Sequence, residues 1–246
     1  MTSTRILVTR ILLCALCICL LASCRLPWKQ VHTNTNLAKL PKPTTQQLLA
    51  NLQKNFRTVK AFHVLMQVQN AGTAQSDQIQ IRSANGDVLM PDKVKAQATV
   101  ILSGQSVIIS LISMGSNQYI TDPITGQWRQ VQGVLDPRTL TNPDTGIISL
   151  IGKVHNVSDP VSDTINTVPC WRIQGQLAAQ DLAFLTGGGM PAGTQLQTSA
   201  CIGKGDNLPY LVTVTGQASP TDTAQTTRSF LLSNYNQKVT INPPQL

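Results

Sequence analysis

Residues 96–111 read AQATVILSGQSVIISL, and this stretch indicates the fold. Its apolar residues recur at every second position on both sides of Ser103-Gly104-Gln105. That period is typical of a β-strand with one buried face, and a polar break containing glycine marks a turn. The stretch therefore predicts two antiparallel strands. Their shared apolar face contains Ala96, Ala98, Val100 and Leu102 from the first strand, and Val107, Ile109 and Leu111 from the second.

The same period continues on both sides of this hairpin. Phe62, Val64, Met66 and Val68 alternate with polar residues, and Ile79 and Ile81 repeat the pattern. Asn85-Gly86-Asp87 is a turn signal. We expect successive antiparallel strands joined by tight turns, followed by a second set. The further strands are expected over residues 117–121, 154–157, 164–168, 170–176, 195–202, 211–216 and 228–235.

Three segments carry a helical pattern instead. Thr44 or Thr45 can cap a helix that continues to about Lys60, with apolar residues at helical spacing. Residues 136–153 interrupt the strands, and their last part forms an almost wholly apolar helix face. Residues 178–185 predict a short helix that ends before Gly187-Gly188-Gly189.

The N-terminus has the architecture of a secretory signal. Arg5 and Arg10 precede an apolar run over residues 11–21, which is shorter than the ~20 residues of a membrane-spanning helix. Leu21-Ala22-Ser23-Cys24 resembles a bacterial lipobox, in which the cysteine is acylated and becomes the first mature residue. We therefore expect a signal peptide over 1–23, a lipidated flexible tether over 24–43 and one domain over 44–246. The protein is then extracytoplasmic and anchored to the cell membrane through Cys24.

The mature chain would be basic. The formal charge of +8 falls to +6 when Arg5 and Arg10 are removed. A basic surface favours anionic lipid headgroups or cell-wall polymers, and it equally serves solubility. Binding of nucleic acid is not expected, because no basic cluster alternates with aromatic residues and the compartment is wrong.

The cysteines fall into two groups. Cys14, Cys17 and Cys19 belong to the signal peptide, and Cys170 and Cys201 are the pair that remains beside Cys24. In an oxidising compartment this pair predicts a disulfide, and two buried free thiols are the alternative.

Catalytic motifs are missing from the sequence. It contains no Gly-x-Ser-x-Gly and no glutamate, so no His-Glu-x-x-His. His32 lies in the tether, His63 among strand residues and His155 at a junction of helix and strand. The aspartates beside Pro, Gly, Ser or Thr suit turns and caps. We expect no enzyme activity, no cofactor and no metal site.

Residues 135–150, LDPRTLTNPDTGIISL, resemble the LppX/LprAFG family of mycobacterial lipoproteins. In that family Asp-Pro, followed by Leu-x-Asn-Pro-Asp-x-Gly, opens a helix that covers a sheet. Ala61-Phe62-His63-Val64, Gly115-Ser116-Asn117-Gln118-Tyr119 and residues 232–241 also match the family pattern. The resemblance spans roughly residues 44–244. Cys170, Cys201 and Gly187-Gly188-Gly189 depart from it.

The resemblance implies an α+β fold: a strongly curved antiparallel sheet, or half-barrel, with helices across its concave face, as in the LolA-type carriers. It also implies an apolar cavity for the acyl chains of a lipid or glycolipid, with a membrane transporter as a candidate partner. Face parity gives the candidate ligand-binding residues. They are Val100, Leu102, Val107, Ile109 and Leu111 from the sheet, and Ile147, Ile148, Ile151, Phe184 and Leu185 from the helices.

The pattern of residues alone does not distinguish a hollow fold from a filled core. A hollow fold would serve lipid transport or transfer. A filled core would suit a structural or adaptor lipoprotein with a protein or cell-wall partner. The observations that separate the two are a cavity and lipid carried by the purified protein.

Overall fold

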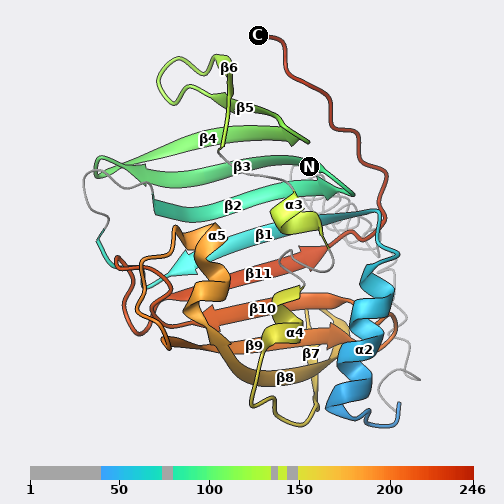
Figure 1. The fold of residues 1–246 in the computed structure, drawn as a ribbon. Helices are drawn as coiled ribbons and strands as arrows, with labels where there is room; N and C mark the ends of the chain where they lie inside the picture. Colours follow the sequence, from blue (N-terminus) through green and yellow to red (C-terminus); the bar gives the residue numbers. More distant parts are fainter. Residues whose placement is uncertain (1–39, 74–79, 134–137, 143–148) are drawn as a thin grey trace, which may run out of the picture. The chain divides into compact units, whose positions relative to one another are not determined.

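The computed structural model of the protein describes residues 40–73, 80–133, 138–142 and 149–246. In these residues eleven strands form one antiparallel sheet in the order β6-β5-β4-β3-β2-β1-β11-β10-β9-β8-β7 (Figure 1). The strands are β1 (Ala61–Gln69), β2 (Gln80–Leu89), β3 (Lys93–Leu102), β4 (Gln105–Met114), β5 (Asn117–Thr121), β6 (Trp128–Val131), β7 (Val161–Ile165), β8 (Val168–Ala178), β9 (Gln195–Gly203), β10 (Pro209–Thr215) and β11 (Thr227–Ser233).

The described helices are short. They are α2 (Thr45–Phe56), α3 (Arg138–Thr141), α4 (Ser149–Lys153), the 3-10 helix η3 (Ala179–Leu182) and α5 (Ala183–Thr186). Figure 1 shows α2, α4 and α5 on the same side of the sheet. None of these helices has the length and apolar character needed to cross a membrane.

The first and last strands pair at the centre of the sheet. In the antiparallel register of β1 and β11, Val64 lies opposite Leu232 and Met66 opposite Phe230. Every other pair of neighbouring strands is consecutive in sequence, and β6 and β7 form the two edges of the sheet. The β1–β11 pair therefore joins the two halves of the sheet and aligns their apolar residues on one face.

Helix α2 packs on that face. Thr44 caps the helix: its hydroxyl accepts from the Gln47 backbone at 3.2 Å, and the Gln47 side chain accepts from the Thr44 backbone at 3.0 Å. This capping box fixes the predicted start of the helix. The side chains of Leu48, Leu52 and Phe56 are at most 1% exposed, so the helix is held by burial of one apolar stripe.

The buried apolar residues form two clusters in the described part of the chain. The first joins α2 to the middle of the sheet, with the rings of Phe56 and Phe62 5.8 Å apart. The second joins α4 and η3 to β8, β9 and β10. Its buried members are Leu150, Leu177, Ala179, Leu182, Leu196, Val214 and Ala218.

Four expectations about the sheet need correction. Residues 154–157 form no strand and make only an isolated bridge, between His155 and Gln176. The strand expected over 164–168 is divided between the end of β7 and the first residue of β8, with a turn between them.

The fold is mostly β, and the sheet is not strongly curled, so the expected strongly curved half-barrel is not what the structure shows. The alternation of apolar and polar residues along a strand specifies which face is buried but not how far the sheet curls. The expectation of a strongly curved sheet rests on the family resemblance alone.

The turn predicted at Asn85-Gly86-Asp87 is also wrong, because these residues lie inside β2. Gly86 pairs with Ala96 of β3. A Cβ atom on Gly86 would lie 2.6 Å from the Ala96 Cβ and 2.7 Å from the Ala96 Cα. The glycine is therefore needed for a close approach of two strands rather than for a turn.

The predicted disulfide is confirmed. Cys170 of β8 and Cys201 of β9 are bonded, with their Cα atoms 5.6 Å apart and both residues fully buried. The bond links neighbouring strands across 31 positions of sequence, on the side of the sheet opposite Trp171 and Ile202.

Replacing both cysteines by alanine should lower the free energy of unfolding by about 3–4 kcal/mol, because the unfolded chain gains the freedom of an open loop. Urea unfolding of the wild-type protein with and without reductant, compared with the double variant, measures this. If the reduced wild type is as stable as the oxidised protein, the bond contributes nothing to stability.

Gly86→Ala should destabilise the protein by about 1–3 kcal/mol, because the new methyl group meets backbone atoms of β3 that cannot give way. The matched control is Gly152→Ala in α4, where a Cβ meets only the end of the flexible Gln53 side chain. The control should be neutral or slightly stabilising, since alanine favours a helix. Equal melting temperatures for the two variants would contradict the close-approach argument.

Candidate functional site

An apolar cavity lies between the two clusters. Fourteen of its sixteen lining residues are apolar, and they come from both clusters and from their edges. The lining consists of Phe62, Val64, Val88, Leu150, Ile151, Val154, Ile173, Gln174, Leu177, Leu182, Thr198, Ala200, Val212, Val214, Phe230 and Leu232.

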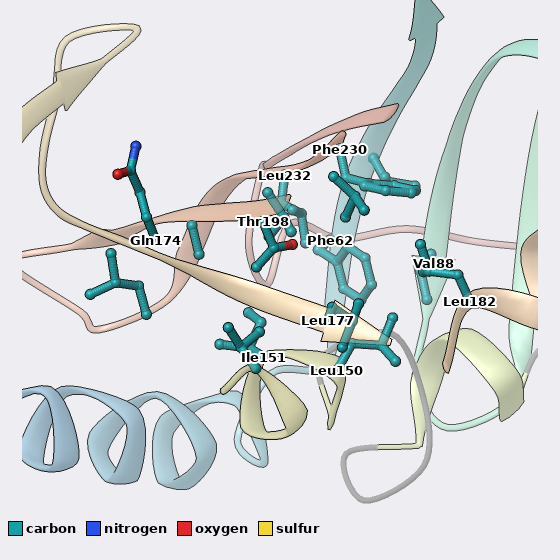
Figure 2. A pocket seen from close by; sticks show the side chains of 16 residues that line it. Phe62, Val88, Leu150, Ile151, Gln174, Leu177, Leu182, Thr198, Phe230 and Leu232 are labelled. Carbon is teal, nitrogen blue, oxygen red and sulfur yellow. The ribbon is translucent and has the colours of Figure 1, made fainter. Parts of the chain in front are cut away.

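Strand register gives the cavity its floor. Phe62 pairs with Val88, Phe230 with Val212, and Ala200 with both Val212 and Ile173. Because residues directly opposite each other point to the same face, these side chains form one continuous surface. Figure 2 shows Phe62 and Phe230 across the pocket from Ile151, which comes from α4.

The cover comes from segments that pair little with the sheet. Leu150 and Ile151 belong to α4, Val154 follows it, and Leu182 ends η3. Residues 154–157 lie close against β8 at Gly175: a Cβ atom there would lie 2.8 Å from the His155 carbonyl oxygen. His155 and Gln176 exchange backbone hydrogen bonds of 2.9 Å, which hold this segment against the strand.

Polar groups in the lining are few. Thr198 is 8% exposed, and its hydroxyl donates to the Thr213 carbonyl oxygen at 3.2 Å. The other polar lining residue, Gln174, is exposed to solvent. The buried part of the cavity therefore offers a ligand apolar surface and almost no hydrogen bonds.

The cavity is small in this structure. About 50 Å³ is available to the centre of a water-sized molecule, where one water needs about 10–15 Å³ by the same measure. An apolar cavity of this kind stays dry. The space accepts a few methylene groups as it stands, and a longer chain requires the cover to move.

Charged groups surround the cavity without lining it. Lys153 of α4 and Asp181 of η3 form an ion pair of 2.8 Å between the two cover elements. Asp222 and Arg228 form a buried pair, also 2.8 Å, and Asp222 further accepts from the backbone of Ala218 and Ser219. That buried carboxylate is compensated by hydrogen bonds and orders the loop before β11.

The tyrosines beside the first cluster remain neutral. Burial raises the pKa of the Tyr235 phenol well above its usual value. Burial, and then the hydrogen bond that Tyr210 donates to Asp206 at 2.6 Å, raise the pKa of Tyr210. Burial penalises the ionised form, so neither ring brings charge to this side of the core.

The structure separates the predicted ligand-binding residues. Ile151 lies in the cavity lining. Val100, Leu102, Val107, Ile109 and Leu111 share the apolar face of the sheet, but they lie on β3 and β4 and do not line the cavity. Phe184 is 37% exposed, and Leu185 packs against both clusters; neither residue lines the cavity. Ile147, Ile148 and the predicted lipidation site Cys24 lie outside the described residues.

Most of the lining was not predicted. Three of the missed residues, Leu150, Val154 and Leu182, belong to the cover. The others are on β1, β2 and β8–β11, where side chains such as Phe62 and Phe230 show period-two alternation. Their parity was visible in the sequence. The sequence did not show that residues from the two halves of the sheet lie side by side, because this depends on the pairing of β1 with β11.

The described residues contain no group of three His, Cys, Asp or Glu side chains that could hold a metal ion. Lys153 and Asp181 are the titratable residues of α4 and η3, and they pair with each other. The arrangement is thus suited to apolar binding.

Comparison with solved structures supports the fold. LprF from Mycobacterium bovis matches with a TM-score of 0.63 at 18% identity, over 83% of this chain and 99% of that one. The lipoprotein LppX from Mycobacterium tuberculosis matches with a TM-score of 0.56 at 17% identity, over 80% and 100% of the two chains. A LolA superfamily protein from Nitrosomonas europaea matches with a TM-score of 0.26 at 10% identity, over 80% and 95% of the two chains. Comparison with curated proteins returned no match.

The sequence itself matches a family model. The model described as LppX_LprAFG lipoprotein covers residues 44–241, which is most of the chain and begins at the cap of α2. No catalytic family is indicated by these comparisons. The chain therefore belongs to the LppX/LprAFG family of lipoproteins.

Proposed function

We propose that the protein is a membrane-anchored extracytoplasmic lipoprotein that binds the acyl chains of a lipid or glycolipid, for lipid transport or transfer. The observation that carries the proposal is the apolar cavity between sheet and cover, with fourteen apolar residues among sixteen. Each methylene moved from water into such a site gains about 0.8 kcal/mol. Membership of the family supports the proposal, because the resemblance implies a cavity for acyl chains.

A carrier function is still proposed, but without the strongly curved half-barrel that the resemblance implied. The sheet is not strongly curled here, so the volume for a ligand has to come from displacement of α4 and η3 rather than from a preformed trough. Strands bound by backbone ladders on both sides resist displacement, whereas helices of four and five residues are held by few side chains.

The adaptor function is the second candidate, and one observation favours it. A cavity of about 50 Å³ is too small for a whole acyl chain unless the cover moves. Under that reading the apolar residues serve stability, and a cell-surface partner binds elsewhere. Lipid carried by protein purified without detergent separates the two functions.

Ala200 and Ala61 make a matched pair for the test. Both are strand alanines and nearly fully buried, at 3% and 2% exposed, but only Ala200 lines the cavity. Ala200→Leu should fill the space and weaken binding of a fluorescent long-chain fatty acid about tenfold or more, as roughly two methylene groups lose their place. Its melting temperature should change little.

Ala61→Leu is the control for overpacking. It should cost about 1–3 kcal/mol of stability and leave the affinity of the folded protein unchanged. If wild-type protein binds no fatty acid, and both leucine variants lose the same stability, then the core is filled and the adaptor function stands.

The proposed anchor at Cys24 has its own test. Cys24→Ser should prevent acylation and move the protein from the membrane fraction to the soluble fraction, since no other lipid-bearing residue is expected. Fractionation and mass measurement of the mature N-terminus report the result. Unchanged membrane association with an N-terminus elsewhere would contradict anchoring at this residue.

A further inference from the structure

We infer that η3 and α5, residues 179–186, form a lid over the cavity and that the ion pair between Lys153 and Asp181 holds the lid closed. The inference rests on the proposed lipid binding for its purpose, but the contacts that carry it are independent of any ligand. The ion pair would then control how fast a ligand enters and leaves the cavity.

The lid reaches the cavity through one side chain. Leu182 is fully buried and lines the cavity, and it is the only residue of 179–186 in the lining. The opposite wall consists of strands with a backbone ladder to each neighbour, and its displacement would break those ladders. Withdrawal of Leu182 is therefore the smaller change that enlarges the space.

A few polar contacts fasten the lid at its two ends. The Ala179 amide donates to the Thr194 carbonyl at 2.9 Å, and the Thr186 hydroxyl donates to the Ala218 carbonyl at 2.9 Å. After Thr186 the chain continues through Gly187, Gly188 and Gly189, with φ angles of 78°, 72° and 90°. A run of residues without Cβ in this region leaves the end of the lid free to change direction.

The third fastening is the ion pair, and it crosses between the two cover elements. Lys153 ends α4, whose Leu150 and Ile151 line the cavity, and Asp181 precedes Leu182. Closing the pair therefore holds two walls of the cover together. The two side chains are 50% and 26% exposed, so salt and charged lipid headgroups can reach the pair. An exposed pair of this kind is weak enough to open reversibly.

The first experiment measures the lid without ligand. Amide hydrogen exchange over residues 179–187 should be about two- to fivefold faster in Asp181→Asn than in wild type, the factor that loss of a surface ion pair gives. The matched control is Asp159→Asn, which removes the exposed Lys42–Asp159 pair of 3.4 Å away from the lid. The control should leave exchange over 179–187 unchanged. Equal exchange in wild type and Asp181→Asn overturns the inference.

The second experiment measures ligand exchange in stopped flow, with the same fluorescent fatty acid as probe. Asp181→Asn and Lys153→Met should raise the association and dissociation rates by the same factor as the amide exchange, with the affinity nearly unchanged. The charge swap Lys153→Asp with Asp181→Lys should restore wild-type rates. High salt should accelerate the wild type and leave Asp181→Asn unaffected.

The two experiments distinguish a failure of the proposed lipid binding from a failure of the proposed lid. If no form of the protein binds the probe, the proposed function is contradicted, and hydrogen exchange still decides whether the ion pair closes the lid. If the probe binds but all rates are equal to those of the wild type, lipid binding stands and the ion pair is not the fastening.

Discussion

The fold depends on the backbone ladder between β1 and β11. Residues 63–69 pair with 227–233, so the two ends of the domain meet at the middle of the sheet. All other strand pairs are local hairpins, which cost little chain entropy to form, whereas this pair closes a loop of more than half the chain. The cost is offset by apolar contacts such as Val64 with Leu232 and Met66 with Phe230. Because the register is fixed, the apolar faces of both halves become one surface.

That surface is larger than its cover, and the cavity follows from the difference. Only α2 is long enough to bury a full stripe of side chains, and the other described helices have four or five residues. Helix α2 packs on one part of the face and η3 on another. Helix α4 contributes Ile151 to the first cluster and Leu150 to the second, and the cavity lies between the two clusters. An empty apolar cavity forfeits contacts that a filled core would have. The protein accepts this loss of contacts between the two clusters, where both sides are apolar.

The sequence predicts local structure here better than it predicts the site. Alternation identified β1, β3 and β4, and Thr44 marked the start of α2, because both signals depend on neighbours in sequence. The turn predicted at Asn85-Gly86-Asp87 was wrong. A glycine that allows two strands to lie close together cannot be distinguished in the sequence from a glycine in a turn. The predicted lining on β3 and β4 had the correct face. Which strands lie beneath α4 depends on the β1–β11 pairing, and no local pattern reports that pairing.

The chemistry of the cavity limits what it can recognise. Thr198, the buried polar residue of the lining, already donates its hydroxyl to Thr213, so it has no second proton to offer a ligand. Apolar walls distinguish chains that differ by one methylene by only about 0.8 kcal/mol, roughly a fourfold effect. A hydrogen-bonding site, by contrast, rejects a ligand that leaves its polar groups unpaired. If the cavity binds an acyl chain as proposed, it would select that chain by length and volume, and any selection between headgroups would have to be made by residues outside it.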